Sequence, residues 1–131
     1  MKLEGKVAIV TGAAGGIGRG ITLCFAEEGA DVVIADMAMD NANKVAEEVR
    51  GLGRKALVVQ ADVSQIKDTE RLVESAVKEF GKIDILVNNA AGGRPKSGAT
   101  EGGPKVADIS EEAWDATYEG VFKSQALMCR S

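Results

Sequence analysis

Apolar side chains recur along the chain in four short runs rather than in one long stretch. The runs are rich in valine and isoleucine and follow one another at intervals of about 25 residues. They are mostly continuous rather than alternating with polar residues, which is typical of strands buried on both faces of a parallel sheet. The sequence therefore predicts four strands, within Val7–Val10, Val32–Ala35, Ala56–Val59 and Ile83–Val87.

Helical periodicity occupies the three intervals between these runs. Apolar residues recur there at spacings of three and four, which predicts one buried stripe on each helix. Glycines follow each segment, where a left-handed C-terminal cap needs a residue without a Cβ atom. The alternation of strand and helix predicts one α/β domain with a parallel sheet and right-handed crossovers. The predicted stripes are Ile17, Ile21, Cys24 and Phe25; Ala42, Val45, Ala46 and Val49; and Ile66, Val73, Ala76, Val77 and Phe80, and the capping glycines are Gly29, Gly51 with Gly53, and Gly81.

The last third of the chain has a different character. Residues 90–109 carry both prolines and five glycines with little apolar periodicity, and a loop of this length is uncommon unless it covers a site. Ser110 can then cap a last helix over 110–130, and no fifth strand is predicted after it. We therefore expect residues 1–131 to form a single domain whose last helix has the apolar stripe Trp114, Tyr118, Val121, Phe122 and Met128.

A glycine-rich segment, 11–18, follows the first predicted strand directly and opens the first helix. Gly12 lets the chain turn sharply, and Gly16 and Gly18 remove Cβ atoms that would keep a diphosphate or a neighbouring strand away from the helix end. Free backbone N–H groups and the positive end of the helix dipole then favour a phosphate. A glycine-rich turn without a ligand is the alternative. The residues predicted to bind the phosphates are Gly12, Ala14, Gly15, Gly16, Ile17 and Gly18.

Asp36 ends the second strand, 18 residues after Gly18. An acid near this position accepts hydrogen bonds from the adenosine ribose in dinucleotide-binding folds. Its charge would repel a 2′-phosphate, and neither Met37 nor Ala38 supplies a compensating cation. The sequence therefore predicts NAD(H) as the cofactor, with NADP(H) disfavoured. The alternative is that Asp36 only caps a helix or closes a turn.

These features together resemble the short-chain dehydrogenase/reductase family. The resemblance covers residues 3 to about 131 and is carried by three motifs in chain order: Thr11-Gly12-x-x-x-Gly16-Ile17-Gly18, Asp62-Val63, and Asn88-Asn89-Ala90, the last followed here by Ala91 before Gly92.

The resemblance implies roles for the two later motifs. Asp62 and Val63 would contact the adenine, and Asn89 and Ala90 would approach the ribose and the nicotinamide side of the cofactor. For Asn88 the alternative is that its side chain only ties neighbouring strands together.

The resemblance also implies a Rossmann-like, doubly wound parallel sheet with strand order 3-2-1-4, here truncated after the fourth helix. In the family the fourth strand is flanked by a fifth, so Ile83–Val87 would form an exposed apolar edge in this chain. We therefore expect that this chain is part of a longer protein, or that it depends on a partner. Family members are usually homotetramers, which implies a homo-oligomer (a dimer or tetramer).

The family's chemistry needs a tyrosine, a lysine four residues later, a serine and an asparagine. Tyr118 is the only tyrosine, and Lys123 lies five positions after it, which places the two side chains about 140° apart on a helix. The interval between Trp114-Asp115 and Gly120-Val121-Phe122 is about one helical turn shorter than in the family, where the asparagine would lie. The sequence thus predicts no catalytic residue in this chain, with the serine and the Tyr-x-x-x-Lys pair lying beyond it.

Two functions follow from the resemblance. The first is an NAD-dependent oxidoreductase that transfers a hydride between the nicotinamide and an alcohol or ketone, with Gly92–Gly103 bordering the substrate pocket. Acyl-carrier-bound ketones, sugars and small alcohols are all open as its substrate. The alternative is a non-catalytic NAD-binding remnant or oligomerisation module.

Charge and composition argue against several other classes of function. The net charge of −4 argues against binding nucleic acid or an anionic membrane by bulk charge. No apolar run reaches the roughly 18 residues of a membrane span. Histidine is absent, so Ser-His-Asp catalysis and histidine-containing zinc sites are excluded, and no metal site is predicted. Cys24 and Cys129 lie 105 positions apart, and we expect Cys24 to be a reduced core thiol in a cytoplasmic protein.

Overall fold

A computed structural model describes residues 1–90 and 128–129 of the chain. The predicted loop beyond Ala90 and nearly all of the predicted helix 110–130 lie outside the described residues. Within them, strands and helices alternate as predicted, and the fourth strand begins at Ile85 rather than at Ile83. The elements are β1 (Val7–Thr11), α1 (Gly16–Glu27), β2 (Asp31–Asp36), α2 (Met39–Gly51), β3 (Ala56–Gln60), α3 (Ile66–Phe80) and β4 (Ile85–Val87).

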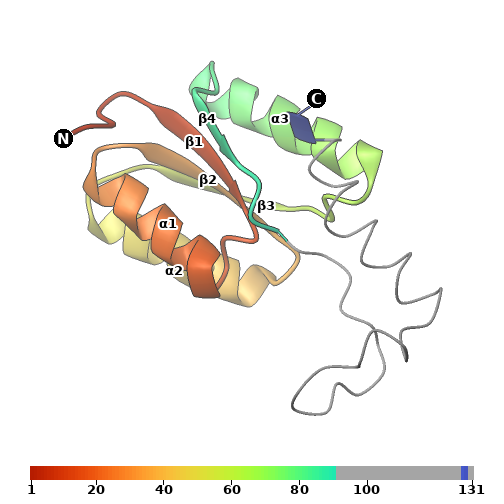
Figure 1. Cartoon of the computed structure of the whole chain (residues 1–131), viewed down its shortest axis with the longest axis horizontal. Coiled ribbons are helices and arrows are strands. Elements are labelled where there is room, and N and C mark those ends of the chain that lie inside the picture. The colour runs from red at the N-terminus through yellow and green to blue at the C-terminus, as the bar shows by residue number, and fades with distance from the viewer. Residues whose placement is uncertain (91–127, 130–131) are drawn as a thin grey trace, which may run out of the picture.

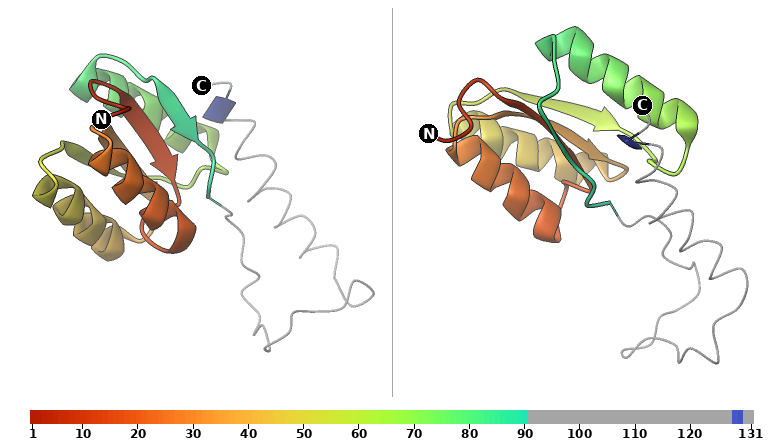
Figure 2. Two further views of the ribbon diagram at one scale, coloured as in Figure 1. Left: turned by 60° about the vertical axis from the view of Figure 1, so that its left-hand side comes forward. Right: turned by 45° about the horizontal axis from the view of Figure 1, so that its top comes forward.

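The four strands form one parallel sheet with the order β3-β2-β1-β4. Helices α1 and α2 cover one face of this sheet and α3 covers the other (Figures 1 and 2). The doubly wound, Rossmann-like fold and the strand order 3-2-1-4 are thereby confirmed. Strand β4 lies at an edge of the sheet as far as the described residues define it.

Alternating strand residues face two apolar cores. Val10 of β1 and Ile34 of β2 point towards α1 and α2, whereas Ile9 and Val33 point towards α3, because successive side chains of a strand face opposite sides of the sheet. All four are at most 1% exposed. Met128, from the predicted last helix, is 3% exposed and belongs to the α3-side core.

The predicted stripe of α1 is wrong for two of its members. Ile17 is 77% exposed, and Cys24, expected to be a core thiol, is also exposed. The fully buried side of α1 consists of Gly18, Thr22 and Ala26. These small residues let the helix approach the sheet closely, which bulky side chains on that side would prevent. Periodicity located the helix but not the side that packs.

The two other helices agree better with their patterns. On α2 all four predicted residues, from Ala42 to Val49, are buried. On α3 Ala76 is buried as predicted, but Ile66 and Val77 are 38% and 44% exposed. Leu72, which the predicted α3 stripe omitted, is fully buried. The real α3 stripe therefore lies to one side of the predicted one.

Glycines end the helical segments at three of the four predicted positions. Gly29, Gly53 and Gly81 have φ values of +96°, +81° and +78°. Gly51 is instead the last residue of α2, so the left-handed position after this helix is filled by Gly53 alone. The prediction was therefore right for Gly53 and wrong for Gly51.

An acidic side chain holds the start of β4 beside β1. An Asp84 carboxylate oxygen accepts hydrogen bonds from the Val7 amide at 2.9 Å and from Lys82 Nζ at 2.9 Å. The Lys82 hydrogen bond, followed by that of the Val7 amide, lowers the pKa of Asp84 below its ordinary value. Asp84 thus fixes the end of the sheet opposite to the site described below.

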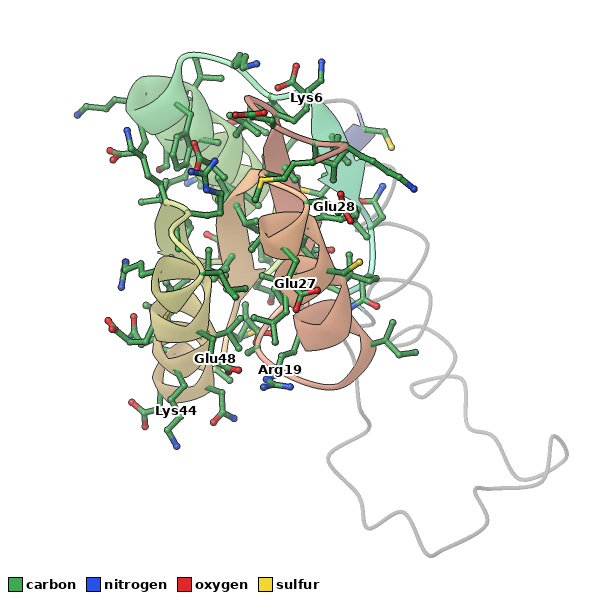
Figure 3. The ribbon with its side chains drawn as sticks, turned by 90° about the vertical axis from the view of Figure 1, so that its left-hand side faces the viewer. Lys6, Arg19, Glu27, Glu28, Lys44 and Glu48 are labelled. Atoms are coloured by element: carbon green, nitrogen blue, oxygen red, sulfur yellow. The ribbon has the colours of Figure 1, made fainter. Side chains whose placement is uncertain are left out.

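An exposed ion pair joins the two helices on one face of the sheet. Arg19 of α1 and Glu48 of α2 lie towards one another (Figure 3), with Arg19 Nε 3.1 Å from Glu48 Oε1. The hydrogen bond that Arg19 donates to the Glu48 carboxylate raises the pKa of Arg19. Because both side chains are well exposed, the pair contributes little to the stability of the fold. It does, however, pair the positive charge of Arg19 with a carboxylate of α2.

Candidate functional site

The candidate site lies at the carboxyl ends of the strands, where β1 leads into α1 (Figures 1 and 2). Two glycines shape this connection. Gly12 has a φ of +64° and Gly16 a φ of +54°, both in the left-handed region that side chains disfavour. Gly12 therefore provides the sharp turn that the sequence predicted, and Gly16 a second one at the start of the helix.

Gly18 allows the first turn of α1 to touch the end of β1. A Cβ atom on Gly18 would lie 2.1 Å from the Gly12 carbonyl oxygen and 2.6 Å from Asn89 Nδ2. A Cβ atom on Gly16 would meet nothing within 4 Å. The two glycines thus differ in purpose: Gly18 is required for packing, whereas Gly16 leaves open space in front of the helix end.

Backbone amides at the start of α1 are available to an anion. The amides of Gly12 and Ala13 donate to the Ala35 carbonyl at 2.8 and 3.4 Å. No acceptor among the described residues meets the four amides of residues 15–18. The helix also has no capping side chain and no acidic residue in its first turn. The positive end of α1 is therefore left for an external acceptor, as phosphate-binding helices require.

Asp36 closes this loop against β2. Its Oδ2 accepts a hydrogen bond from the Ala14 amide at 3.0 Å, and its Oδ1 accepts one from the Ala38 amide at 2.9 Å. The second bond is the turn-closing role considered as the alternative for Asp36. Each carboxylate oxygen accepts one amide and keeps further acceptor capacity, so the turn role and ligand binding are compatible.

The Asn-Asn-Ala segment is fastened to the end of β1 by Thr11. The buried Thr11 hydroxyl accepts the amides of Asn89 and Ala90, both at 3.0 Å, and donates to the Val87 carbonyl at 3.2 Å. Asn89 Nδ2 donates in turn to the Thr11 and Gly12 carbonyls, both at 3.2 Å. The tie between strands considered for Asn88 is thus made by Asn89, while the side chain of Asn88 donates to Cys129 Sγ at 3.5 Å.

The residues after β3 are held in a compact turn. Asp62 Oδ1 accepts the Ser64 amide at 3.0 Å and the Ser64 hydroxyl at 2.6 Å, and the Asp62 amide donates to Asp68 Oδ2 at 2.9 Å. Val63 is 6% exposed and belongs to the core. This turn presents Asp62 and the backbone of Val63 to the same edge of the sheet as Asp36.

A pocket of about 230 Å³ lies between these segments. Pockets that hold a whole drug-sized ligand measure about 300–1,000 Å³, so this one suits one nucleoside rather than a whole dinucleotide. It brings together five residues predicted from sequence and three that were not. The lining residues are Gly12, Asp36, Asp62, Val63 and Ala90, together with Ala35, Met37 and Ala61.

The three unpredicted lining residues carried no chemical signal. Ala35 lies near the end of β2 and Ala61 directly follows β3, and both are small apolar residues that the fold brings into one core cluster. Met37 is 60% exposed and could have been suspected from its place next to Asp36.

The remaining predictions concern metal ions, the catalytic residues and the membrane. Among the described residues no group of histidine, cysteine or acidic side chains could hold a metal ion. Tyr118, Lys123 and Gly92–Gly103 lie outside the described part of the chain. No helix within the described residues has the length and apolar character that crossing a membrane requires.

The fold is that of a doubly wound, Rossmann-like α/β domain with a pocket at the carboxyl ends of its strands. A family described as short chain dehydrogenase matches residues 6–131, and the chain belongs to this family.

Relatives extend the match to named proteins. The chain is 45% identical over 96 residues to 7alpha-hydroxysteroid dehydrogenase of Escherichia coli (strain K12), covering 73% of this chain and 38% of that protein. It is 40% identical over 126 residues to 3-oxoacyl-(acyl-carrier-protein) reductase of Thermotoga maritima, covering 93% of this chain and 48% of that protein. The chain thus spans about half or less of the length of these relatives.

A solved structure supports the fold and shows a ligand. The crystal structure of 3-ketoacyl-(acyl-carrier-protein) reductase from Brucella melitensis, complexed with NADH, is similar with a TM-score of 0.83 and 38% identity. The similarity covers 98% of this chain and 48% of that one.

Proposed function

We propose that this chain forms the NAD(H)-binding half of a short-chain oxidoreductase that interconverts an alcohol and a ketone. The observation that carries the proposal is the pocket of about 230 Å³, bounded by Asp36 and Asp62, beside the acceptor-free amides of residues 15–18. When bound, the cofactor supplies hydride transfer at its nicotinamide. The residues of this chain bind and orient it.

Each part of the dinucleotide has a matching group in the described residues. The amides of residues 15–18 suit the diphosphate, and Gly16 leaves the open space that the phosphates need. Asp36 suits the adenosine ribose, because its oxygens retain acceptor capacity beyond the two amides. Asp62 and Val63 suit the adenine. Asn89 and Ala90, held by Thr11, lie on the β4 side, towards the nicotinamide half in our proposal.

Charge around Asp36 supports NAD(H) over NADP(H). The residues that line the pocket include two carboxylates and no lysine or arginine within the described part of the chain. Arg19, which follows the glycine-rich segment, is paired with Glu48. A 2′-phosphate beside Asp36 would therefore meet a like charge without compensation. At 4 Å such a repulsion is about 4 kcal/mol for an effective dielectric constant near 20.

Competitive titration of the 131-residue chain with NADH and NADPH, followed by nicotinamide fluorescence, tests the preference. We expect NADH to bind at least about tenfold more tightly, and Asp36→Ala to reduce this ratio towards one. Asp31→Ala is the matched control, because Asp31 lies at the other end of β2 and its Oδ1 likewise accepts a backbone amide, from Lys55 at 2.9 Å. NADPH binding as tightly as NADH to the wild-type chain would refute the preference.

The rest of the proposal concerns the whole protein. We propose a small alcohol or ketone as substrate, a homo-oligomeric state (a dimer or tetramer) and a cytoplasmic location, in line with the dehydrogenase and reductase relatives. NADH oxidation by the full-length protein with a panel of ketones tests the activity, and light scattering after size-exclusion chromatography tests the assembly. Binding of NADH without turnover of any ketone would favour the non-catalytic NAD-binding module.

A further inference from the structure

The glycine-rich loop is tied to the end of β2 by three successive amides. Those of Gly12 and Ala13 donate to the Ala35 carbonyl, and that of Ala14 donates to Asp36 Oδ2. The first two bonds are between backbone groups and form whatever side chains are present. The third is the only one of the three that depends on a side chain.

The position of this third bond gives it a particular consequence. Ala14 is the last loop residue whose amide has an acceptor within the described residues, and the acceptor-free amides begin at Gly15. Gly15 is extended, with a φ of −168°, and Gly16 then turns into the left-handed region with a φ of +54°. Glycines have wide conformational freedom, so the segment after Ala14 needs an anchor to keep its amides aimed at one point.

We propose that Asp36 is a positioning residue for the phosphate-binding loop as well as the partner of the ribose. Its Oδ2 holds the Ala14 amide, its Oδ1 holds the Ala38 amide, and the loop is thereby held in its anion-binding shape before any ligand arrives. This inference rests on the proposed function and deepens it. Preorganised donors bind an anion more tightly because ordering the loop costs nothing at the moment of binding.

A role in the ribose contact alone and a role in loop positioning make different predictions for a ligand without ribose hydroxyls. The two probes are ADP and 2′,3′-dideoxyadenosine diphosphate, which has the diphosphate but neither hydroxyl group. A purely ribose-directed Asp36 has nothing to contact in the second probe. If Asp36 also positions the loop, Asp36→Ala weakens binding of both probes.

The first measurement needs no ligand. Amide hydrogen exchange of the 131-residue chain, followed by NMR, should show exchange at Ala14 about tenfold faster or more in Asp36→Ala. Exchange at Gly12 should change less, because its acceptor is a backbone carbonyl. Asp31→Ala should accelerate the Lys55 amide and leave Ala14 unchanged. Asp36→Leu, which has a side chain of similar size but no acceptor oxygen, serves if the alanine variant does not fold. Unchanged exchange at Ala14 would overturn the inference.

The second measurement is calorimetric titration with the two probes. Asp36→Ala should weaken binding of 2′,3′-dideoxyadenosine diphosphate about threefold or more, whereas Asp31→Ala should not. Wild-type affinity of Asp36→Ala for this probe overturns the positioning role and leaves the proposed function intact. Failure of the wild-type chain to bind ADP and NADH overturns the proposed function, and the positioning of a phosphate loop is overturned with it.

Discussion

Replacing Gly18 by alanine tests most sharply why α1 lies where it does. The added Cβ atom would sit 2.1 Å from the Gly12 carbonyl oxygen and 2.8 Å from its carbon, both of them backbone atoms that cannot rotate away. Overpacking of this kind costs about 1–3 kcal/mol. The same atom would lie 2.6 Å from Asn89 Nδ2, which donates to the Thr11 and Gly12 carbonyls. Losing these two bonds adds about 1–2 kcal/mol.

The sum of about 2–5 kcal/mol is a large fraction of the 5–15 kcal/mol that stabilises a typical domain. Urea unfolding followed by circular dichroism measures it. Gly20→Ala is the matched control, because Gly20 lies on the same helix and an added Cβ atom would meet nothing within 4 Å. Alanine at an open helical position should stabilise the chain by up to about 1 kcal/mol.

Gly18→Ala is thus predicted to lower the unfolding free energy, and Gly20→Ala, two residues away, to raise it. The same variants should differ in NADH binding, because a shift of α1 away from Gly12 displaces the amides that follow it. Equal unfolding free energies for Gly18→Ala and Gly20→Ala would refute the close approach of helix and strand.

Three further predictions follow from contacts around the sheet. Thr11→Val should lower the unfolding free energy by about 1–3 kcal/mol, because Thr11 is 1% exposed and its hydroxyl accepts hydrogen bonds from two amides. Thr11→Ser keeps the hydroxyl and should restore the stability. Equal stability of all three proteins in urea would contradict this. The hydrogen bond from Lys82 lowers the pKa of Asp84, so its stabilisation is present above the ordinary pKa of about 4 and is lost as pH falls through the lower folded pKa. The deficit in melting temperature of Asp84→Asn should therefore shrink at acidic pH, and a constant deficit from pH 7 to 2 would count against it. Gly16→Val and Gly53→Val each place a side chain on a left-handed residue in open space, at a cost of about 1–2 kcal/mol. Only Gly16→Val should weaken NADH binding in a fluorescence titration. Equal NADH affinities of the two variants would contradict cofactor binding at the start of α1.

The strands and α2 were predictable because their signals are local and strong. Short runs rich in β-branched residues, such as Val32–Ala35, are typical of a strand buried on both faces, and the whole stripe from Ala42 to Val49 is buried as its period indicated. Helix α1 shows the limit of such patterns. Its buried side is small because Gly18 must reach the Gly12 carbonyl, and a hydrophobic period counts bulky residues only.

The candidate site also has a part that could be predicted from local sequence and a part that could not. Gly12, Gly16 and Asp36 could be predicted because a sharp turn, an open helix end and a strand-terminal acid each demand a residue type within a short segment. The hydrogen bonds that Asn89 donates to Thr11 join positions 78 residues apart. Such a contact depends on the pairing of β1 with β4, and no local pattern contains it.

In our proposal the acceptor-free amides at the start of α1 bind the diphosphate of NAD(H). Titration of the isotopically labelled chain with NADH and with ADP, followed by amide chemical shifts, tests it most directly. We expect the largest shifts at Gly15, Gly16, Ile17 and Gly18, and we expect both ligands to cause them, because both carry the diphosphate. Saturation with NADH that leaves these four amides unshifted would contradict it.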